Sequence, residues 1–107
     1  MDETRACCPA CAEDVRHKAR PRDPAQLKNL QSRLNRMMGQ LSGIGRMLEE
    51  NRYCGDVLTQ IAAVESALTA FGYIVLREHL ETCVADDLRA GRDESLDEVM
   101  DLIRKLK

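Results

Sequence analysis

Three residues have the types and the spacing to bind a soft metal ion: Cys54, His79 and Cys83. His79 and Cys83 are four residues apart, so on a helix their side chains lie on one face. A single histidine or cysteine on a helix more often has a structural role, and two ligands rarely hold an ion tightly. Cys54 is the obvious third ligand. Two thiolates and one imidazole suit Cu(I), or Zn(II) if a fourth ligand joins, and exclude ions that prefer oxygen.

One chain cannot bring these ligands together if a single helix joins them. A rise of 1.5 Å per residue places Cys54 about 38 Å or more from His79 and Cys83 along a continuous helix. In an antiparallel homodimer of that helix, however, Cys54 of one chain lies beside His79 and Cys83 of the other. The sequence therefore predicts two symmetric sites, each shared between two chains.

The element before the ligands is expected to be a long helix that begins at Asp23. Asp23 is a suitable N-cap, Pro24 suits the first helical position, and Gln26 is placed to close a capping box. Apolar residues then recur at alternating steps of three and four, which is typical of a coiled coil or a helical bundle. These positions are Leu27, Leu30, Leu34, Met37, Leu41, Ile44 and Leu48.

The ligands themselves are expected on a second long helix. Residues 51–55 interrupt the first apolar pattern and are short enough for a tight reversal between antiparallel helices. A second apolar register starts at Val57 and extends to Leu80, and the helix that carries it is expected to run to about Ala90, where Gly91 offers a left-handed stop.

A third, shorter helix is expected near the C-terminus and completes an all-α protomer of three helices. Asp93 or Ser95 can cap it, and Ser95 and Glu98 have the spacing of a capping box. Two long helices and a short one cannot enclose a good core, so the hairpin should dimerise into an antiparallel four-helix bundle. The expected organisation is a flexible cysteine-containing tail at residues 1–22 and one helical domain at residues 23–107.

Composition agrees with a small helical protein. Of the 107 residues, 44% are hydrophobic and only 3% aromatic, a profile that favours a bundle over a sandwich or barrel. No uninterrupted apolar run approaches the ~20 residues that cross a bilayer, and no signal-peptide pattern is present. We therefore expect a cytoplasmic protein without a membrane partner, in which the five cysteines favour metal or redox chemistry over disulfides. No phosphate loop or catalytic triad is visible, so an enzyme is not expected.

Charge is distributed unevenly along the chain. Residues 16–46 contain eight basic residues and one acidic residue, whereas residues 53–107 contain six basic and eleven acidic residues. An anionic partner would therefore bind the N-terminal half, although the alternative is simply a solvated helix face.

Three segments carry a resemblance to a known family. RLNRMMGQLSGI at residues 33–44 is similar to the RLxRxxGQxxGI signature of the CsoR family of bacterial metal-sensing repressors. RYCGDVLTQI at residues 52–61 resembles that family's RYCxDxLxQI segment, and HLETCV at residues 79–84 resembles its HxxxCV motif. The similarity extends over about residues 24–107.

The resemblance implies a helical dimer that assembles into a tetramer and binds operator DNA without a helix-turn-helix. In the copper-responsive branch of the family, Cu(I) binding releases the DNA and permits expression of copper efflux genes. Cys54, His79 and Cys83 match the Cu(I) ligands of that branch. Tyr53 and Glu98 resemble neighbouring residues that couple ligation to DNA release.

The other branches fit less well. Nickel and cobalt sensors of the family have histidine at the position of Cys83, and formaldehyde sensors have proline at the position of Asp2. Persulfide sensors keep both cysteines but lack the histidine at position 79. The resemblance therefore favours the copper-responsive branch.

The expected DNA-binding residues lie on and before the first helix. Arg33 and Arg36 are three residues apart on it, and Lys28 and Arg22 continue the positive surface toward its N-terminus. Such a surface binds phosphates, and we expect recognition to depend largely on the shape of the duplex.

The tail adds three possible accessory thiols, Cys7, Cys8 and Cys11, and a Cys-x-x-Cys pair such as Cys8 and Cys11 can bind metal or form a disulfide. Two alternatives to the copper-responsive repressor stay open. One is a reactive-sulfur sensor that joins Cys54 to Cys83 of the partner chain. The other is a copper-buffering bundle that binds no DNA, for which the basic N-terminal half would have no use.

Overall fold

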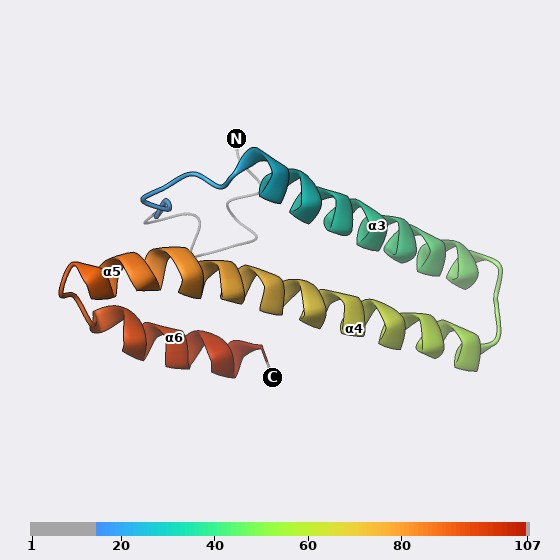
Figure 1. Cartoon of the computed structure of the whole chain (residues 1–107). Coiled ribbons are helices and arrows are strands. Elements are labelled where there is room, and N and C mark those ends of the chain that lie inside the picture. The colour runs from blue at the N-terminus through green and yellow to red at the C-terminus, as the bar shows by residue number, and fades with distance from the viewer. Residues whose placement is uncertain (1–14, 107) are drawn as a thin grey trace.

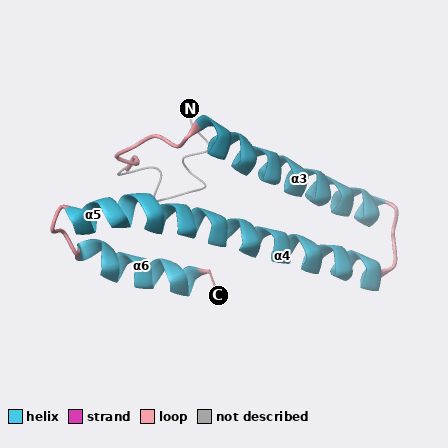
Figure 2. Cartoon of the chain, viewed as in Figure 1, coloured by secondary structure: helices cyan, strands magenta, loops and turns pink. Residues whose placement is uncertain are grey.

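The computed structural model describes residues 15–106, which contain helices and loops but no strand (Figure 2). The elements are α3 (Pro24–Glu49), α4 (Cys54–His79), the π-helix η1 (Leu80–Val84), α5 (Ala85–Arg89) and α6 (Glu94–Lys105). Helices α3 and α4 run antiparallel, and α6 turns back along the end of α4 that leads into α5 (Figure 1). The all-α fold expected from the sequence is confirmed.

Helix α3 begins where the sequence predicts. The Asp23 carboxylate accepts hydrogen bonds from the backbone N–H groups of Ala25, at 3.1 Å, and Gln26, at 3.4 Å. Pro24 occupies the first helical position, where a missing N–H costs nothing. The N-cap and the proline are confirmed, but the expected capping box is wrong, because among residues 15–106 the Asp23 N–H makes no hydrogen bond to the Gln26 side chain.

The reversal between α3 and α4 follows from local backbone geometry. Asn51 has a φ of 55°, a left-handed conformation that asparagine tolerates better than most residues. The N–H of Arg52 donates to the carbonyl of Met47 at 2.9 Å, which closes the last turn of α3. Helix α4 then starts after Tyr53, whose side chain makes no capping hydrogen bond.

Helix α4 continues through η1 into α5 as one helical run. The run ends at the predicted glycine: Gly91 has a φ of 82°, and its N–H donates to the Leu88 carbonyl at 3.0 Å. From Cys54 to Arg89 the run is long and apolar enough, by length and composition alone, to cross a membrane. The sequence prediction missed this feature because it considered only uninterrupted apolar runs. A helix that is apolar on several faces can equally be buried in an assembly.

One protomer covers only part of its apolar surface. The buried apolar residues are Leu30, Met37, Val57, Val84 and Val99. Most other members of the predicted α3 register are exposed, with Leu41 at 55% and Leu48 at 62%. Leu58 and Leu68 on α4 are similarly exposed. The apolar periodicity therefore marks surface that a single hairpin leaves uncovered.

The start of α6 differs from the prediction. Asp93 occupies the N-cap position, but the expected capping box between Ser95 and Glu98 is wrong. The Ser95 hydroxyl donates instead to the Asp87 carboxylate, and Glu98 accepts a hydrogen bond from Arg16. Both side chains therefore make tertiary contacts that compete successfully with the local cap.

Candidate metal centre

The three predicted metal ligands lie at opposite ends of the α4 run. Cys54 is the first residue of α4 and is exposed, whereas His79 ends α4 and Cys83 lies in η1. Within residues 15–106, no group of three or more His, Cys, Asp or Glu side chains is placed to hold a metal ion. The fold thus keeps Cys54 away from His79 and Cys83 within one chain, as the helix geometry predicts.

The His79–Cys83 pair lies where the helix changes from α to π. The N–H of Ala85 bonds to the carbonyl of Leu80, five residues earlier, which widens this turn. The Thr82 hydroxyl donates to the Glu78 carbonyl at 2.8 Å and thereby satisfies a backbone acceptor near the change in register. π-helical turns are frequent at functional sites. The sequence gives no periodicity signal for this insertion.

The His79 imidazole has an unused ligand atom. Its Nε2 is buried and has no hydrogen-bond partner among residues 15–106. Buried nitrogens ordinarily have a partner, because leaving one unpaired costs about 1–3 kcal/mol. Cys83 nearby is a half-buried free thiol. A soft metal ion that accepts imidazole and thiolate donors therefore fits these two side chains.

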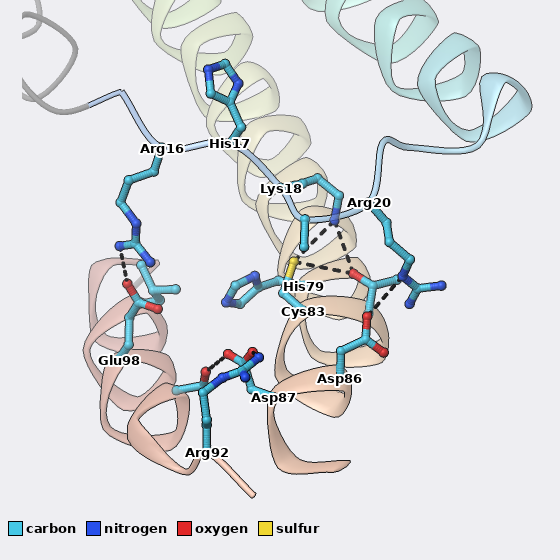
Figure 3. Close-up of a pocket in the computed structure, with 14 residues that line it drawn as sticks. Arg16, His17, Lys18, Arg20, His79, Cys83, Asp86, Asp87, Arg92 and Glu98 are labelled. Carbon is cyan, nitrogen blue, oxygen red and sulfur yellow. Dashed lines mark hydrogen bonds and ion pairs between the residues drawn. The ribbon is translucent and has the colours of Figure 1, made fainter. Parts of the chain in front are cut away.

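His79 and Cys83 line a cavity of about 400 Å³ (Figure 3). Its opposite wall is formed by residues 16–20, which precede α3 in the sequence. The Lys18 ammonium donates to Thr82 Oγ1 at 3.1 Å and to Cys83 Sγ at 3.4 Å. Lys18 was not a predicted site residue. The available signal was the alternation of basic residues at positions 16, 18, 20 and 22.

Tyr53 and Glu98 are divided between the same two ends. Tyr53 directly precedes Cys54 and is 75% exposed. Glu98 on α6 lines the cavity of His79 and Cys83, and its Oε2 accepts a hydrogen bond from Arg16 at 3.0 Å. Each cysteine therefore has one of these two residues near it, and they do not meet in one chain.

Asp87 connects α5 to α6 beside the cavity. A hydrogen bond from Ser95, together with one from Arg92 at 2.9 Å, holds the pKa of the Asp87 carboxyl below its ordinary value. The same contact raises the pKa of Arg92, so both groups stay charged near neutral pH. This pair fixes the turn that carries α6 back along α4.

The predicted DNA-binding residues divide into two groups. Lys28, Arg33 and Arg36 are exposed on α3, and none of them forms an ion pair within the described part of the chain. Arg22 instead bonds to Glu78 at 2.8 Å, and both side chains are largely withdrawn from solvent. The accessory thiols Cys7, Cys8 and Cys11 lie outside the described residues.

The fold and these side chains define a helical hairpin whose second helical run carries two thiols and an imidazole, the donors that soft metal ions prefer. Residues 26–105 match the family model described as metal-sensitive transcriptional repressor. The chain is 50% identical over 66 residues to the copper-sensing transcriptional repressor RicR of Mycobacterium tuberculosis, an alignment that covers 62% of this chain and 69% of RicR. It is 40% identical over 75 residues to the copper-sensing transcriptional repressor CsoR of Bacillus subtilis, covering 69% and 74% respectively.

Solved structures agree with this match. The copper-sensing repressor CsoR with Cu(I) from Geobacillus thermodenitrificans superposes with a TM-score of 0.79 at 40% identity, covering 86% of this chain and 97% of that one. The nickel-responsive transcriptional regulator InrS superposes with a TM-score of 0.68 at 30% identity, covering 83% and 99%. The chain therefore belongs to the family of metal-sensitive transcriptional repressors, which are regulators rather than enzymes.

Proposed function

We propose that this protein is a Cu(I)-responsive transcriptional repressor that binds operator DNA in its apo form and releases it when Cu(I) binds, which derepresses copper efflux genes. The observation that carries the proposal is the buried, unpartnered Nε2 of His79 in a cavity shared with the Cys83 thiol. The names of the relatives RicR and CsoR, which are copper-sensing repressors, support the choice of metal.

The proposed site is shared between two chains. Cys54 of one protomer joins His79 and Cys83 of the partner subunit, because the two ends of α4 meet when two such helices pack antiparallel. The exposed leucines of α3 and α4 support this assembly, since burying them removes apolar surface from water. We extend the assembly to a dimer of dimers. Bound Cu(I) supplies a soft centre that prefers thiolate and imidazole donors.

Ligation is transmitted to DNA through helix packing. Leu30 and Met37 are buried on α3, and the exposed Arg33, which is three residues from Leu30 and four from Met37, lies at the edge of the same face. Fixing two α4 helices relative to each other at Cys54 therefore repositions the α3 surfaces of the assembly. Because such coupling is reciprocal, bound operator weakens Cu(I) affinity by the factor by which Cu(I) weakens operator affinity.

The remaining assignments follow from the repressor role. Operator DNA and further copies of this chain are the proposed partners, and the cytoplasm, where the DNA lies, is the proposed location. Tyr53 and Glu98 are proposed to stand next to the assembled ligands. Cys7, Cys8 and Cys11 are proposed as accessory thiols that assist metal capture.

A reactive-sulfur sensor is the second candidate, because Cys54 is an exposed free thiol and Cys83 is a half-buried one. In that case the two cysteines of neighbouring chains would become joined through sulfur. Copper buffering without DNA binding loses support, because the family consists of transcriptional repressors.

A DNA-binding assay separates these functions. Duplexes that the apo protein selects from a random pool serve as operators, and gel shifts are recorded with apo, Cu(I)-loaded and polysulfide-treated protein. We expect Cu(I) to release the duplex from wild type but not from His79→Ala, which keeps both cysteines. Release by polysulfide alone would assign the protein to sulfur sensing, and failure to select any duplex would contradict the repressor function.

A further inference from the structure

The segment before α3 carries basic residues at every second position, and each of them has a partner in the C-terminal half of the chain. We call residues 16–22 the basic strap. Its contacts are Arg16 to Glu98 at 3.0 Å, Lys18 to Thr82 at 3.1 Å, Arg20 to Asp86 at 2.9 Å and Arg22 to Glu78 at 2.8 Å. All four basic side chains of the segment are therefore engaged within the molecule.

The partners form one surface, which we call the acidic groove: Glu78, Thr82, Asp86 and Glu98. They come from α4, η1, α5 and α6, so the strap crosses every element around the His79–Cys83 cavity (Figure 3). Carboxylates present the same kind of acceptor to an arginine as phosphates do. The carboxylates of the acidic groove thus accept hydrogen bonds from the arginines of the strap in the way that the phosphates of a nucleic acid would.

Docking of the strap on the acidic groove is reversible, because most of the ion pairs that hold it are weak. The Arg16 and Arg20 side chains are 79% and 60% exposed, and ion pairs at such exposure are weak and screened by salt. Only the pair between Arg22 and Glu78 is largely shielded from water. A polyanion of high charge density can therefore compete for most of the strap.

The strap also lies next to the exposed basic surface of α3. A second cavity, of about 650 Å³, is lined by strap residues including Arg20 and Arg22, by Glu78 of the groove and by Arg33 of α3. Asp23 alone separates the strap from the first residue of α3. A strap released from the groove would extend the surface on which Arg33 lies.

We propose that the basic strap exchanges between the acidic groove and the phosphate backbone of duplex DNA. This inference rests on the proposed DNA-binding function. In the docked position the groove withholds four basic side chains from DNA, and in the released position they add to the contacts made by α3. Because the groove surrounds His79 and Cys83, the exchange places one end of the metal site in contact with a DNA-binding element.

A double-mutant cycle on one exposed pair tests the exchange. Wild type, Asp86→Asn, Arg20→Gln and the double variant are titrated by fluorescence anisotropy against a labelled random-sequence duplex, over a series of salt concentrations. Asp97→Asn removes the same charge from an exposed position outside the groove and serves as the matched control. Trypsin cleavage after Lys18, measured without DNA, reports independently on docking, and circular dichroism verifies folding.

We expect trypsin to cleave Asp86→Asn after Lys18 faster than it cleaves wild type. Asp86→Asn should also bind the duplex about threefold more tightly than Asp97→Asn does, which is the size of effect expected from one exposed ion pair. Its affinity should also fall more steeply with salt, by a log–log slope of roughly 0.9 per additional phosphate contact. Arg20→Gln should weaken duplex binding more in the Asp86→Asn background than in wild type, since only a released Arg20 contacts DNA.

The opposite results are equally clear. Equal cleavage rates for Asp86→Asn and Asp97→Asn, or additive effects of Asp86→Asn and Arg20→Gln on duplex affinity, would overturn the exchange. If wild type and all three variants bind the duplex but the effects of the two substitutions are additive, the exchange is contradicted and the proposed repressor function is not. If none binds the duplex even at low salt, the proposed repressor function fails together with it. Glu78→Gln provides a second cycle with Arg22→Gln, at the most shielded pair.

Discussion

The two ends of the α4 run differ in how much of the proposed metal site each one holds. At the N-terminal end Cys54 is exposed on a regular α-helix, with no side-chain cap and only the exposed Tyr53 before it. At the other end, His79 and Cys83 lie at a π-helical turn, beside a cavity that the strap and α6 enclose. The N-terminal end therefore offers a single exposed thiol, whereas the other end offers two donor side chains in a cavity.

This difference indicates which end supplies specificity. A pocket with a buried imidazole nitrogen and a half-buried thiol positions two donors in advance, so less ordering is needed when a ligand binds. The exposed cysteine can reach such a pocket only on another copy of the chain. We infer that the pocket end selects the metal. The Cys54 end makes metal binding depend on assembly, because its thiol completes the site only in a dimer.

The largest effect should come from separating the two ends by mutation. Cys54→Ala and Cys83→Ala proteins should each lose tight Cu(I) binding as homodimers, because every shared site then lacks one thiolate. In a heterodimer of the two variants one site keeps Cys54, His79 and Cys83, so one Cu(I) per dimer should be recovered. Competition with a Cu(I) chelator on tagged, purified heterodimers measures this. Heterodimers that recover no binding would contradict a site shared between chains.

The next largest effect concerns the DNA surface on α3, where Arg33 shares a cavity with Glu78 beside the pocket end. Arg33→Ala should remove most operator binding, because Arg33 is exposed on α3 and has no acidic partner among residues 15–106. The Cu(I) stoichiometry should stay unchanged. Arg104→Ala is the matched control, since Arg104 is exposed on α6 and already pairs with Asp101. Gel shifts and Cu(I) titration check both, and wild-type operator binding by Arg33→Ala would remove α3 from the DNA interface.

Much of this comparison could be predicted from the sequence, because it depends on local signals. The cap at Asp23, the reversal after α3 and the stop at Gly91 are each encoded by one or two residues with strong backbone preferences. The separation of Cys54 from His79 follows from helical rise alone. These features required no knowledge of tertiary contacts.

The pocket end could not be predicted in the same way. The π-helical turn inserts one residue into the helix without a Gly or Pro to mark it, so periodicity does not show it. The contact of Lys18 with Cys83 joins segments 65 residues apart, and the partner of Ser95 proved to be Asp87 rather than a helix terminus. Side chains with several possible partners are decided by tertiary packing, which a local pattern does not contain.

A smaller effect distinguishes a capped helix start from an uncapped one. Asp23→Ala should destabilise the protein by about 1 kcal/mol, because two N–H groups of α3 lose their acceptor. Tyr53→Ala removes no capping hydrogen bond at the start of α4 and should cost less. Urea unfolding at one protein concentration measures the free energies of both variants. A larger cost for Tyr53→Ala would show that the Cys54 end is more ordered than its exposure indicates.

The smallest effect is the pH dependence of the contact between α5 and α6 at the pocket end. The hydrogen bond from Ser95, and then that from Arg92, lowers the pKa of Asp87 in the folded state below its unfolded value of about 3.9. Folding therefore favours the carboxylate, so the stabilisation is fully present above about pH 4 and is lost as the pH falls through the folded pKa.

Asp87→Asn presents a neutral group of the same shape at every pH. The variant should accordingly be less stable than wild type near pH 6, by a small amount because the carboxylate is partly exposed to solvent, and the difference should shrink as the pH falls below about 4. Thermal unfolding at fixed protein concentration across this range measures the difference. Asp97→Asn removes a carboxylate without a side-chain partner in the described part of the chain and sets the baseline. A stability difference for Asp87→Asn that stayed constant with pH would show that packing of α6, rather than the charge of Asp87, holds the pocket end together.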